Sequence, residues 1–273
     1  MKKFEGILIC TDLDGTLLCD DKSISAKNVE AIEYFKAEGG FFTVITGRVP
    51  QTTMEICKTV KPNAPIGCIN GAGVYDWSRG EYIWAQTVPD DICELVAAVY
   101  DEIPDAAAQI NTFGPLYFQS YNSAMIRFRD INNLPDLQKS CDEITEPITK
   151  IFFADDDEEK LLRVIDILSK HPKSGLFSYI RSEIDKYEIL PKGISKGTAL
   201  LKIAEVMGID KRRTVAVGDY NNDIPMMQAA SVGVAVGNAC EEAKAAADYI
   251  TVTNENAAIA KVIEDIENGK ILI

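Results

Sequence analysis

The sequence predicts an α/β protein with a parallel sheet and an inserted α+β segment. Three observations support this fold class. Apolar strand patterns alternate with helix patterns at both ends of the chain, and polar residues follow the strands. The middle of the chain has a different composition and few helix patterns. With 273 residues, of which 47% are hydrophobic, the chain is long enough to bury a substantial core.

The first part of the chain alternates short apolar runs with helix patterns. The helix at Ser25–Glu38 has apolar residues three or four apart and ends at Gly39-Gly40. The runs on either side are short, apolar and β-branched, which is typical of strands buried on both faces. In order, the expected elements are a strand at 6–11, a helix at 25–38, a strand at 41–45, a helix at 51–59 and a strand at 66–69.

The last part of the chain repeats this alternation. A helix is expected from Ser195 to Met207, where Gly208 ends it, and a strand from Thr214 to Val217. Further strands are expected at 232–236 and 249–252, and further helices at 241–247 and 257–267. Because parallel strands bind ligands outside their carboxyl ends, we expect a site where these strands stop.

The middle segment, 86–188, has 10 basic and 20 acidic residues and is rich in aromatic runs. Two strong helix patterns interrupt it, at Asp90–Glu102 and Asp157–Lys170, and the remainder favours antiparallel strands. We therefore predict a discontinuous domain of residues 1–85 and 189–273, with an inserted α+β domain of residues 86–188.

Composition excludes several classes of protein. The net charge of −14 makes nucleic acid an improbable partner, and a single histidine excludes His-rich zinc sites. The seven cysteines are scattered without a CxxC pair, so we expect reduced, mostly buried thiols and no disulfide framework. We find no signal peptide and no apolar run long enough to span a bilayer. We expect a soluble, cytoplasmic protein without a membrane partner.

Polar clusters follow predicted strands or open a predicted helix at four places: Asp12–Thr16, Thr46–Arg48, Lys196 and Asp219–Asp223. Carboxylates brought together repel one another unless a cation lies among them. Oxygen ligands with open positions suit Mg²⁺, which also bridges substrate phosphates. A lysine and a threonine hydroxyl nearby would bind the other phosphate oxygens. The clusters therefore indicate phosphoryl transfer, in which positioning and charge neutralisation supply most of the catalysis.

Several motifs along the chain resemble, in their order, those of the haloacid dehalogenase superfamily. Asp12-Leu13-Asp14-Gly15-Thr16 matches its DxDGT signature. Gly218–Asp223 with Met226 is similar to the GDxxNDxxM signature of the Cof-type branch. Ile69–Ala72 and Gly233–Ala239 also resemble that branch. The resemblance covers the core and implies a Rossmann-like sheet with helices on both faces, with the insert as a cap domain.

The resemblance also implies a role for each matching residue. Asp12 is expected to be the nucleophile that forms an aspartyl-phosphate, and Asp14 the acid and base beside it. The transferring phosphate is expected to be held by Thr46, Gly47, Lys196 and Asn222. The Mg²⁺ site is expected to comprise Asp12, Asp14 (through its backbone carbonyl), Asp219 and Asp223. Whether Asn222 or Asp223 is a direct ligand stays open.

The expected function is a Mg²⁺-dependent phosphatase of small phosphorylated metabolites, with sugar phosphates the leading class. One alternative is a phosphomannomutase-like phosphotransferase, which would pass the phosphoryl group to a sugar. Another is a non-catalytic sugar-phosphate sensor. Arg48 is interpreted as a structural or rim residue. Five basic residues of the expected cap domain are candidates for contact with the substrate, and the sequence does not select among them: Arg127, Arg129, Lys150, Arg181 and Lys186. Monomer and homodimer are both compatible with the sequence.

Overall fold

The computed structural model describes residues 2–273 and divides into two compact units. Unit 1 comprises Met1–Ala85 and Ser195–Ile273, and unit 2 comprises Gln86–Ile194. The chain returns from unit 2 to unit 1 after Ile194, six residues beyond the expected boundary at 188. The difference arises because strand β10 (Lys186–Pro191) continues past residue 188 within unit 2.

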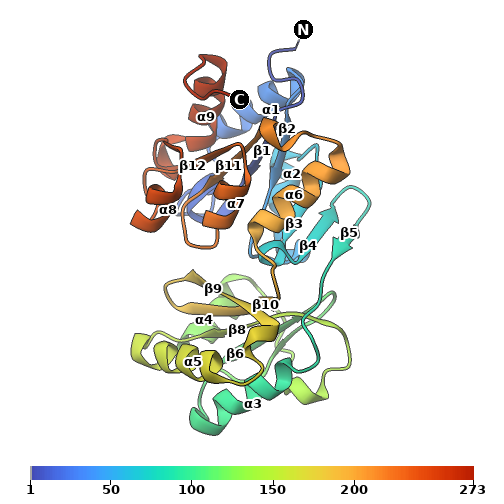
Figure 1. Ribbon diagram of the computed structural model, residues 1–273, viewed down its shortest axis with the longest axis vertical. Coiled ribbons are helices and arrows are strands. Elements are labelled where there is room, and N and C mark those ends of the chain that lie inside the picture. The colour runs from blue at the N-terminus through green and yellow to red at the C-terminus, as the bar shows by residue number, and fades with distance from the viewer. Residues whose placement is uncertain (1) are drawn as a thin grey trace. The chain divides into compact units, whose positions relative to one another are not determined.

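Unit 1 is built on a parallel sheet with the strand order β13-β12-β11-β1-β2. Its strands are β1 (Leu8–Thr11), β2 (Phe41–Val44), β11 (Thr214–Gly218), β12 (Val232–Ala235) and β13 (Tyr249–Ile250). Helices cover both faces, with α1 packed against α9 and α6 against α7 (Figure 1). The Rossmann-like core predicted from the sequence is confirmed.

The helices of unit 1 lie close to where the sequence predicts them, except α7 (Ile224–Ala229), which the sequence analysis did not predict. Ser25 caps α1 by accepting a hydrogen bond from the Asn28 amide, and Gly208 ends α6 in the left-handed conformation. The six helices are α1 (Ala26–Ala37), α2 (Pro50–Val60), α6 (Lys196–Met207), α7 (Ile224–Ala229), α8 (Glu241–Ala246) and α9 (Ala258–Glu267).

The prediction of a third parallel strand at 66–69 is wrong. β3 (Ile66–Cys68) pairs antiparallel with β4 (Gly73–Asp76), which pairs with β5 (Glu81–Ala85) in a separate sheet. The chain reverses after Cys68 because Ile69, Asn70 and Gly71 all have positive φ angles. One isolated parallel bridge still joins Gly67 to Ile45, so β3 begins beside β2 and then diverges.

Unit 2 is an antiparallel sheet with the order β7-β6-β8-β10-β9 and three helices. The sheet contains β6 (Ala108–Thr112), β7 (Leu116–Phe118), β8 (Ile148–Ala154), β9 (Phe177–Glu183) and β10. The helices are α3 (Ile92–Glu102), α4 (Ser123–Ile131) and α5 (Glu158–Lys170). The sequence analysis missed α4, because only Ala124 and Met125 of this helix are buried and its apolar pattern is correspondingly weak.

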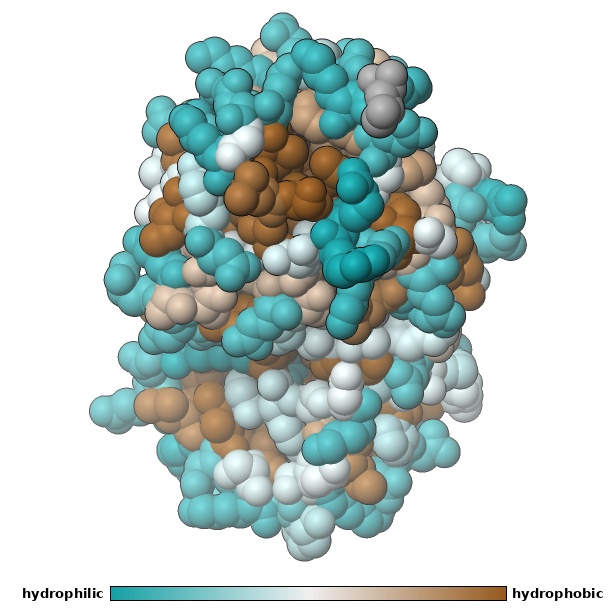
Figure 2. Space-filling model, turned by 45° about the horizontal axis from the view of Figure 1, so that its top comes forward, coloured by the Kyte–Doolittle hydropathy of each residue, from teal (hydrophilic) through white to brown (hydrophobic). Residues whose placement is uncertain are grey.

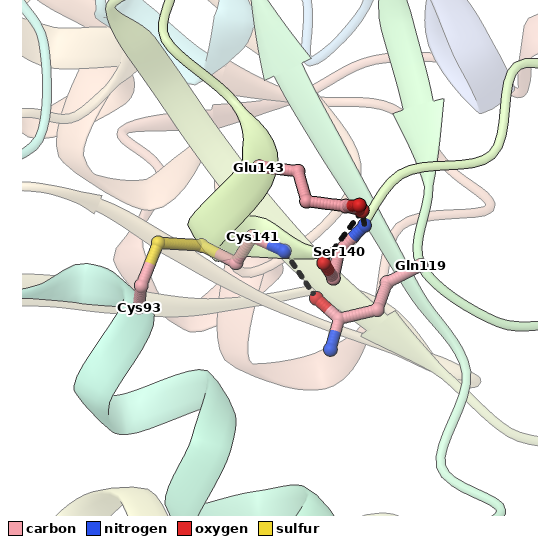
Figure 3. The surroundings of a disulfide bond; sticks show 5 residues. All are labelled: Cys93, Gln119, Ser140, Cys141 and Glu143. Carbon is pink, nitrogen blue, oxygen red and sulfur yellow. Dashed lines mark hydrogen bonds between the residues drawn. A yellow bond between two sulfur atoms is a disulfide. The ribbon is translucent and has the colours of Figure 1, made fainter.

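The expectation that all cysteines are reduced is wrong for one pair. Cys93 of α3 and Cys141 form a disulfide across 48 residues of sequence (Figure 3). The Cys141 amide donates to Gln119 Oε1 at 3.0 Å, and Ser140 and Glu143 cap the short turn that carries Cys141. Each cysteine belongs to the apolar layer between helix and sheet, so the fold brings together two residues whose spacing carries no signal.

Hydrophilic side chains predominate on the face drawn in Figure 2. Apolar side chains gather in one area in the upper half of that view. Over residues 2–273, no helix has the length and apolar character needed to cross a membrane.

Candidate active site

Two aspartates lie side by side at the carboxyl ends of the central strands. Asp12 follows β1 directly, and Asp219 follows β11, the neighbouring strand. The Asp12 amide donates to the Val217 carbonyl at 2.9 Å, which extends the ladder to the point where both carboxylates begin. The prediction that polar residues gather where these strands end is therefore correct for this pair.

Gly15 allows the turn after Asp12 to approach Asp219. Its φ is +76°, a conformation that residues with a side chain rarely adopt, and a Cβ here would lie 2.6 Å from Asp219 Oδ2. Thr16 Oγ1, one residue on, donates to Asp219 Oδ1 at 2.8 Å. The Gly-Thr pair therefore has two physical functions: the glycine makes room for the carboxylate, and the threonine orients it.

Lys196 is the first residue of α6 and is only 1% exposed. Its Nζ donates to Asp12 Oδ1 and to Asp223 Oδ1, each at 2.6 Å. Burial lowers the pKa of Lys196, but the two carboxylates outweigh that effect and raise the pKa above its usual range. The lysine is therefore a fixed cation between two acids that are 211 residues apart in the sequence.

The acidic groups repel one another and are largely hidden from water. Burial raises the pKa of Asp12 well above its usual value, although Lys196 opposes the shift. Burial and the nearby Asp223 raise the pKa of Asp219 to about 7. Without a further positive charge, these carboxyl groups hold protons more tightly than ordinary aspartates do.

Asp12, Asp219 and Asp223 fit a divalent cation, because each offers a carboxylate oxygen within 4.8 Å of the others. Among residues 2–273, Asp12 Oδ2 and Asp219 Oδ2 accept no hydrogen bond. Both oxygens of Asp223 are engaged: Oδ1 binds Lys196, and Oδ2 accepts from the Asp219 and Tyr220 amides at 3.0 and 3.1 Å. Asp12 and Asp219 are thus the better ligands, and Asp223 orients their neighbours.

The Asp14 carboxylate does not join this acidic group. Arg48 donates to it twice, from Nε to Oδ2 at 2.8 Å and from Nη2 to Oδ1 at 2.7 Å, and Lys22 Nζ lies 3.0 Å from Oδ1. Burial alone would raise the pKa of Asp14, but Arg48 outweighs it and lowers the pKa to about 2. In this arrangement Asp14 is an ionised carboxylate held by two cations.

Polar groups from three further loops surround these residues. Thr46 follows Ile45, whose amide extends the β1–β2 ladder by donating to the Thr11 carbonyl at 2.9 Å. A Cβ on Gly47 would lie 3.1 Å from the Asn70 amide group, and Asn222 Nδ2 donates to Asn70 Oδ1 at 3.1 Å. Gly47 and Asn222 are therefore linked through Asn70.

Sequence reasoning missed the position of Arg48, which it interpreted as structural or peripheral, and did not consider Lys22. The sequence did contain a signal for Arg48, because this cation comes directly after the polar end of a predicted strand in a strongly acidic chain. For Lys22 the sequence offers none, since it reaches Asp14 from an exposed loop.

A parallel α/β sheet with buried carboxylates and a buried lysine at its carboxyl edge defines an enzyme of the phosphoryl-transfer class. A model of the haloacid dehalogenase-like hydrolases matches residues 9–263. The chain belongs to this family, as its motifs predicted, and it is a phosphatase of the Cof-type branch.

Similar proteins span nearly the whole chain. Two are 5-amino-6-(5-phospho-D-ribitylamino)uracil phosphatases of Bacillus subtilis (strain 168). YitU is 26% identical, covering 94% of this chain and 96% of its own, and YcsE is 29% identical, covering 94% of each. A haloacid dehalogenase-like hydrolase from Bacteroides thetaiotaomicron, solved as a crystal structure, is 27% identical with a TM-score of 0.83. That match covers 95% of this chain and 99% of the other.

Proposed function

We propose that the protein is a Mg²⁺-dependent phosphatase of small phosphorylated metabolites that works through an aspartyl-phosphate on Asp12. The observation that carries the proposal is the position of Asp12 at the end of β1, where Lys196 Nζ holds one oxygen at 2.6 Å beside Asp219. A carboxylate has lone pairs on both oxygens, so the contact with Lys196 leaves Asp12 able both to bind a metal and to attack phosphorus.

Asp12 and Asp219 would hold the Mg²⁺, with the Asp14 backbone carbonyl as a further oxygen ligand. When bound, the ion would neutralise the carboxylates and the negative charge of the phosphate oxygens. Lys196 would stabilise charge on Asp12 and on the phosphate, and Asp223 would keep Lys196 in place. Thr46, Gly47 and Asn222 would donate hydrogen bonds to the phosphate from the surrounding loops.

In the first step an oxygen of Asp12 attacks phosphorus, the bond to the leaving oxygen breaks, and the Asp14 carboxyl gives that oxygen its proton. In the second step a water attacks phosphorus, the bond to Asp12 breaks, and Asp14 takes the proton of the water. The products are the free alcohol and inorganic phosphate. Asp14 therefore needs a proton in one step and its ionised form in the other.

Arg48 decides which form of Asp14 is present at rest. Its two hydrogen bonds keep Asp14 ionised, which suits the second step but not the first. A phosphate dianion is a competing partner for a guanidinium, and a shift of Arg48 toward it would raise the pKa of Asp14. We infer that Arg48 is a positioning residue that prepares Asp14 for proton uptake when substrate arrives.

The substrate class we favour is the phosphate monoester of a sugar or sugar alcohol. The names of YitU and YcsE specify a phosphorylated ribityl chain as their substrate. The resemblance to the family also implies sugar phosphates as the leading substrate class. Both lines point to a hydroxylated leaving group.

Phosphate release from a panel of phosphomonoesters tests the proposal. The panel includes sugar, sugar alcohol, nucleotide and aromatic esters, each with Mg²⁺ and with EDTA. We expect release with Mg²⁺, loss with EDTA and recovery when Mg²⁺ is restored. Isomerisation of phosphorylated hexoses without phosphate release would establish the phosphotransferase instead, and binding without turnover would establish the sensor. Full activity in EDTA would contradict the metal.

A further inference from the structure

Two asparagines continue the row of polar residues at the carboxyl edge of the parallel sheet. Asn238 follows β12 and Asn254 follows β13, the two strands beyond β11 in the sheet order. Because neighbouring parallel strands end at one edge, both residues lie on the side of the sheet where Asp12 and Asp219 lie. Neither asparagine has a part in the chemistry proposed for Asp12.

Asn238 contacts the turn that follows Asp12. Its Nδ2 donates to the Gly15 carbonyl at 2.8 Å, and its Oδ1 accepts from the Asn254 amide at 2.9 Å. A carbonyl only accepts and a backbone amide only donates, so an asparagine side chain fits both partners, whereas an ionised carboxylate would fit only one. This side chain therefore connects the loop after β13 to the turn after β1.

Asn254 contacts the far end of the same turn. It is 2% exposed, and its Nδ2 donates to the Leu18 carbonyl and to Asp20 Oδ1, each at 3.1 Å. The Leu18 amide in turn donates to the Leu13 carbonyl at 2.8 Å, which closes the turn. Both N–H groups of the buried Asn254 side chain are thus engaged with the segment that directly follows the turn.

The turn Leu13–Leu17 needs contacts from outside, because its backbone departs from helical geometry. Asp14 has a ψ of 122° and Gly15 a φ of 76°, so regular helical hydrogen bonds do not define the whole turn. Thr16 of the same turn orients Asp219 by donating to its Oδ1 at 2.8 Å. A displacement of the turn therefore affects the Asp14 carbonyl and the Asp219 carboxylate together, and both are proposed oxygen ligands of Mg²⁺.

We propose that Asn238 and Asn254 are positioning residues for the metal site. They hold the turn Leu13–Leu17 so that its oxygen atoms are in place before Mg²⁺ binds. The inference rests on the proposed function, because it takes a divalent cation to bind at the active-site carboxylates. The asparagines act through two backbone carbonyls and not by touching the ion. Hydrogen bonds that orient metal ligands in this way typically account for about 10- to 100-fold of metal affinity.

Asn238→Ala tests the proposal in the full-length protein, with Mg²⁺ binding measured by isothermal titration at pH 8 without substrate. Asn238 is exposed, so its replacement leaves the apolar core intact. Asn256→Ala is the matched control, because Asn256 is an exposed asparagine of the loop that carries Asn254, and its Nδ2 donates to Thr253 Oγ1 at 2.7 Å. Thermal unfolding in EDTA establishes that each variant is folded and how much stability it has lost.

We expect the dissociation constant for Mg²⁺ to rise about tenfold in Asn238→Ala and less than about twofold in Asn256→Ala. The Mg²⁺ concentration that gives half-maximal phosphate release should rise by the same factor, whereas kcat at saturating Mg²⁺ should stay close to the wild-type value. A purely structural role would lower the stability of both variants without separating their Mg²⁺ affinities. Asn254→Ala should also weaken Mg²⁺ binding, and Asn238→Ala alone decides the test if that buried replacement does not fold.

The same Mg²⁺ affinity in Asn238→Ala and in the control would overturn the inference and leave the phosphatase proposal intact. A wild-type protein that binds no Mg²⁺ in the titration, or that is fully active in EDTA, would instead overturn the proposed function.

Discussion

Arg48 donates two hydrogen bonds to the Asp14 carboxylate, at 2.8 and 2.7 Å, although the two residues are 34 positions apart in the sequence. This contact lowers the pKa of Asp14 to about 2. It therefore connects the loop after β2 to the protonation state of the group proposed as acid and base.

Arg48→Gln should lower kcat by about 10- to 100-fold, the usual cost of losing a partner that orients a functional side chain. The variant should also raise the pKa of Asp14 in the substrate-free enzyme, where Arg48 binds this carboxylate. The midpoint of the Asp14 carboxyl in a pH titration followed by NMR should then move upward. Arg48→Lys keeps the charge without the two-point contact and should shift this midpoint less. An unmoved midpoint in Arg48→Gln would contradict the role of Arg48.

Asp12→Asn should reduce phosphate release by about 10⁴-fold or more, because an amide cannot replace the carboxylate nucleophile. The matched control is Asp166→Asn on α5, an exposed aspartate paired with Lys170. We expect the control to retain wild-type rates in the same assay. Undiminished turnover in Asp12→Asn would remove this residue from the nucleophile role.

Apparent Mg²⁺ affinity should rise with pH up to about 7. Burial and Asp223 raise the pKa of Asp219 to about 7, so below that pH the ion must displace a proton from a ligand. One displaced proton makes the affinity fall about tenfold per pH unit. Isothermal titration between pH 5.5 and 8 measures this dependence. A flat affinity below pH 7 would show that Asp219 binds the ion without losing a proton.

Gly15→Ala should impair Mg²⁺ binding and phosphate release as well as stability. The left-handed conformation alone costs about 1–2 kcal/mol for a residue with a Cβ. Gly208→Ala is the matched control, because its φ is +65° and nothing lies within 4 Å of the added atom. Both variants should lose unfolding free energy in urea, but only Gly15→Ala should lose Mg²⁺ affinity. Equal activity in the two would show that the contact with Asp219 is unimportant.

The sequence was informative where strands end. Buried strands followed directly by aspartate predicted the meeting of Asp12 and Asp219, since neighbouring parallel strands end at one edge. The motifs then led to Lys196, 184 residues after Asp12. Side-chain contacts between distant loops could not be predicted in this way. The position of Arg48 after a strand does not indicate Asp14 as its partner, and the local sequence pattern does not indicate the pairing of Cys93 with Cys141, because only the folded chain makes these residues neighbours.

The direction of a strand could not be predicted from the local sequence pattern either. The run at Ile66–Cys68 has the composition of a buried parallel strand, yet the three positive φ angles that follow turn it into a hairpin. α4 escaped detection for the opposite reason, since only two of its nine residues are buried. Hydrophobic periodicity in the sequence reflects which face of an element is buried, so a helix with few buried residues has only a weak periodic pattern.

The bond between Cys93 and Cys141 closes a loop that contains β6, β7 and α4. The segment 135–138 within this loop is exposed. A protease that cuts there once should leave two fragments that migrate as a single species on a denaturing gel. They should separate only when a reductant is added, so limited digestion with and without dithiothreitol reveals whether the crosslink is present in a given preparation.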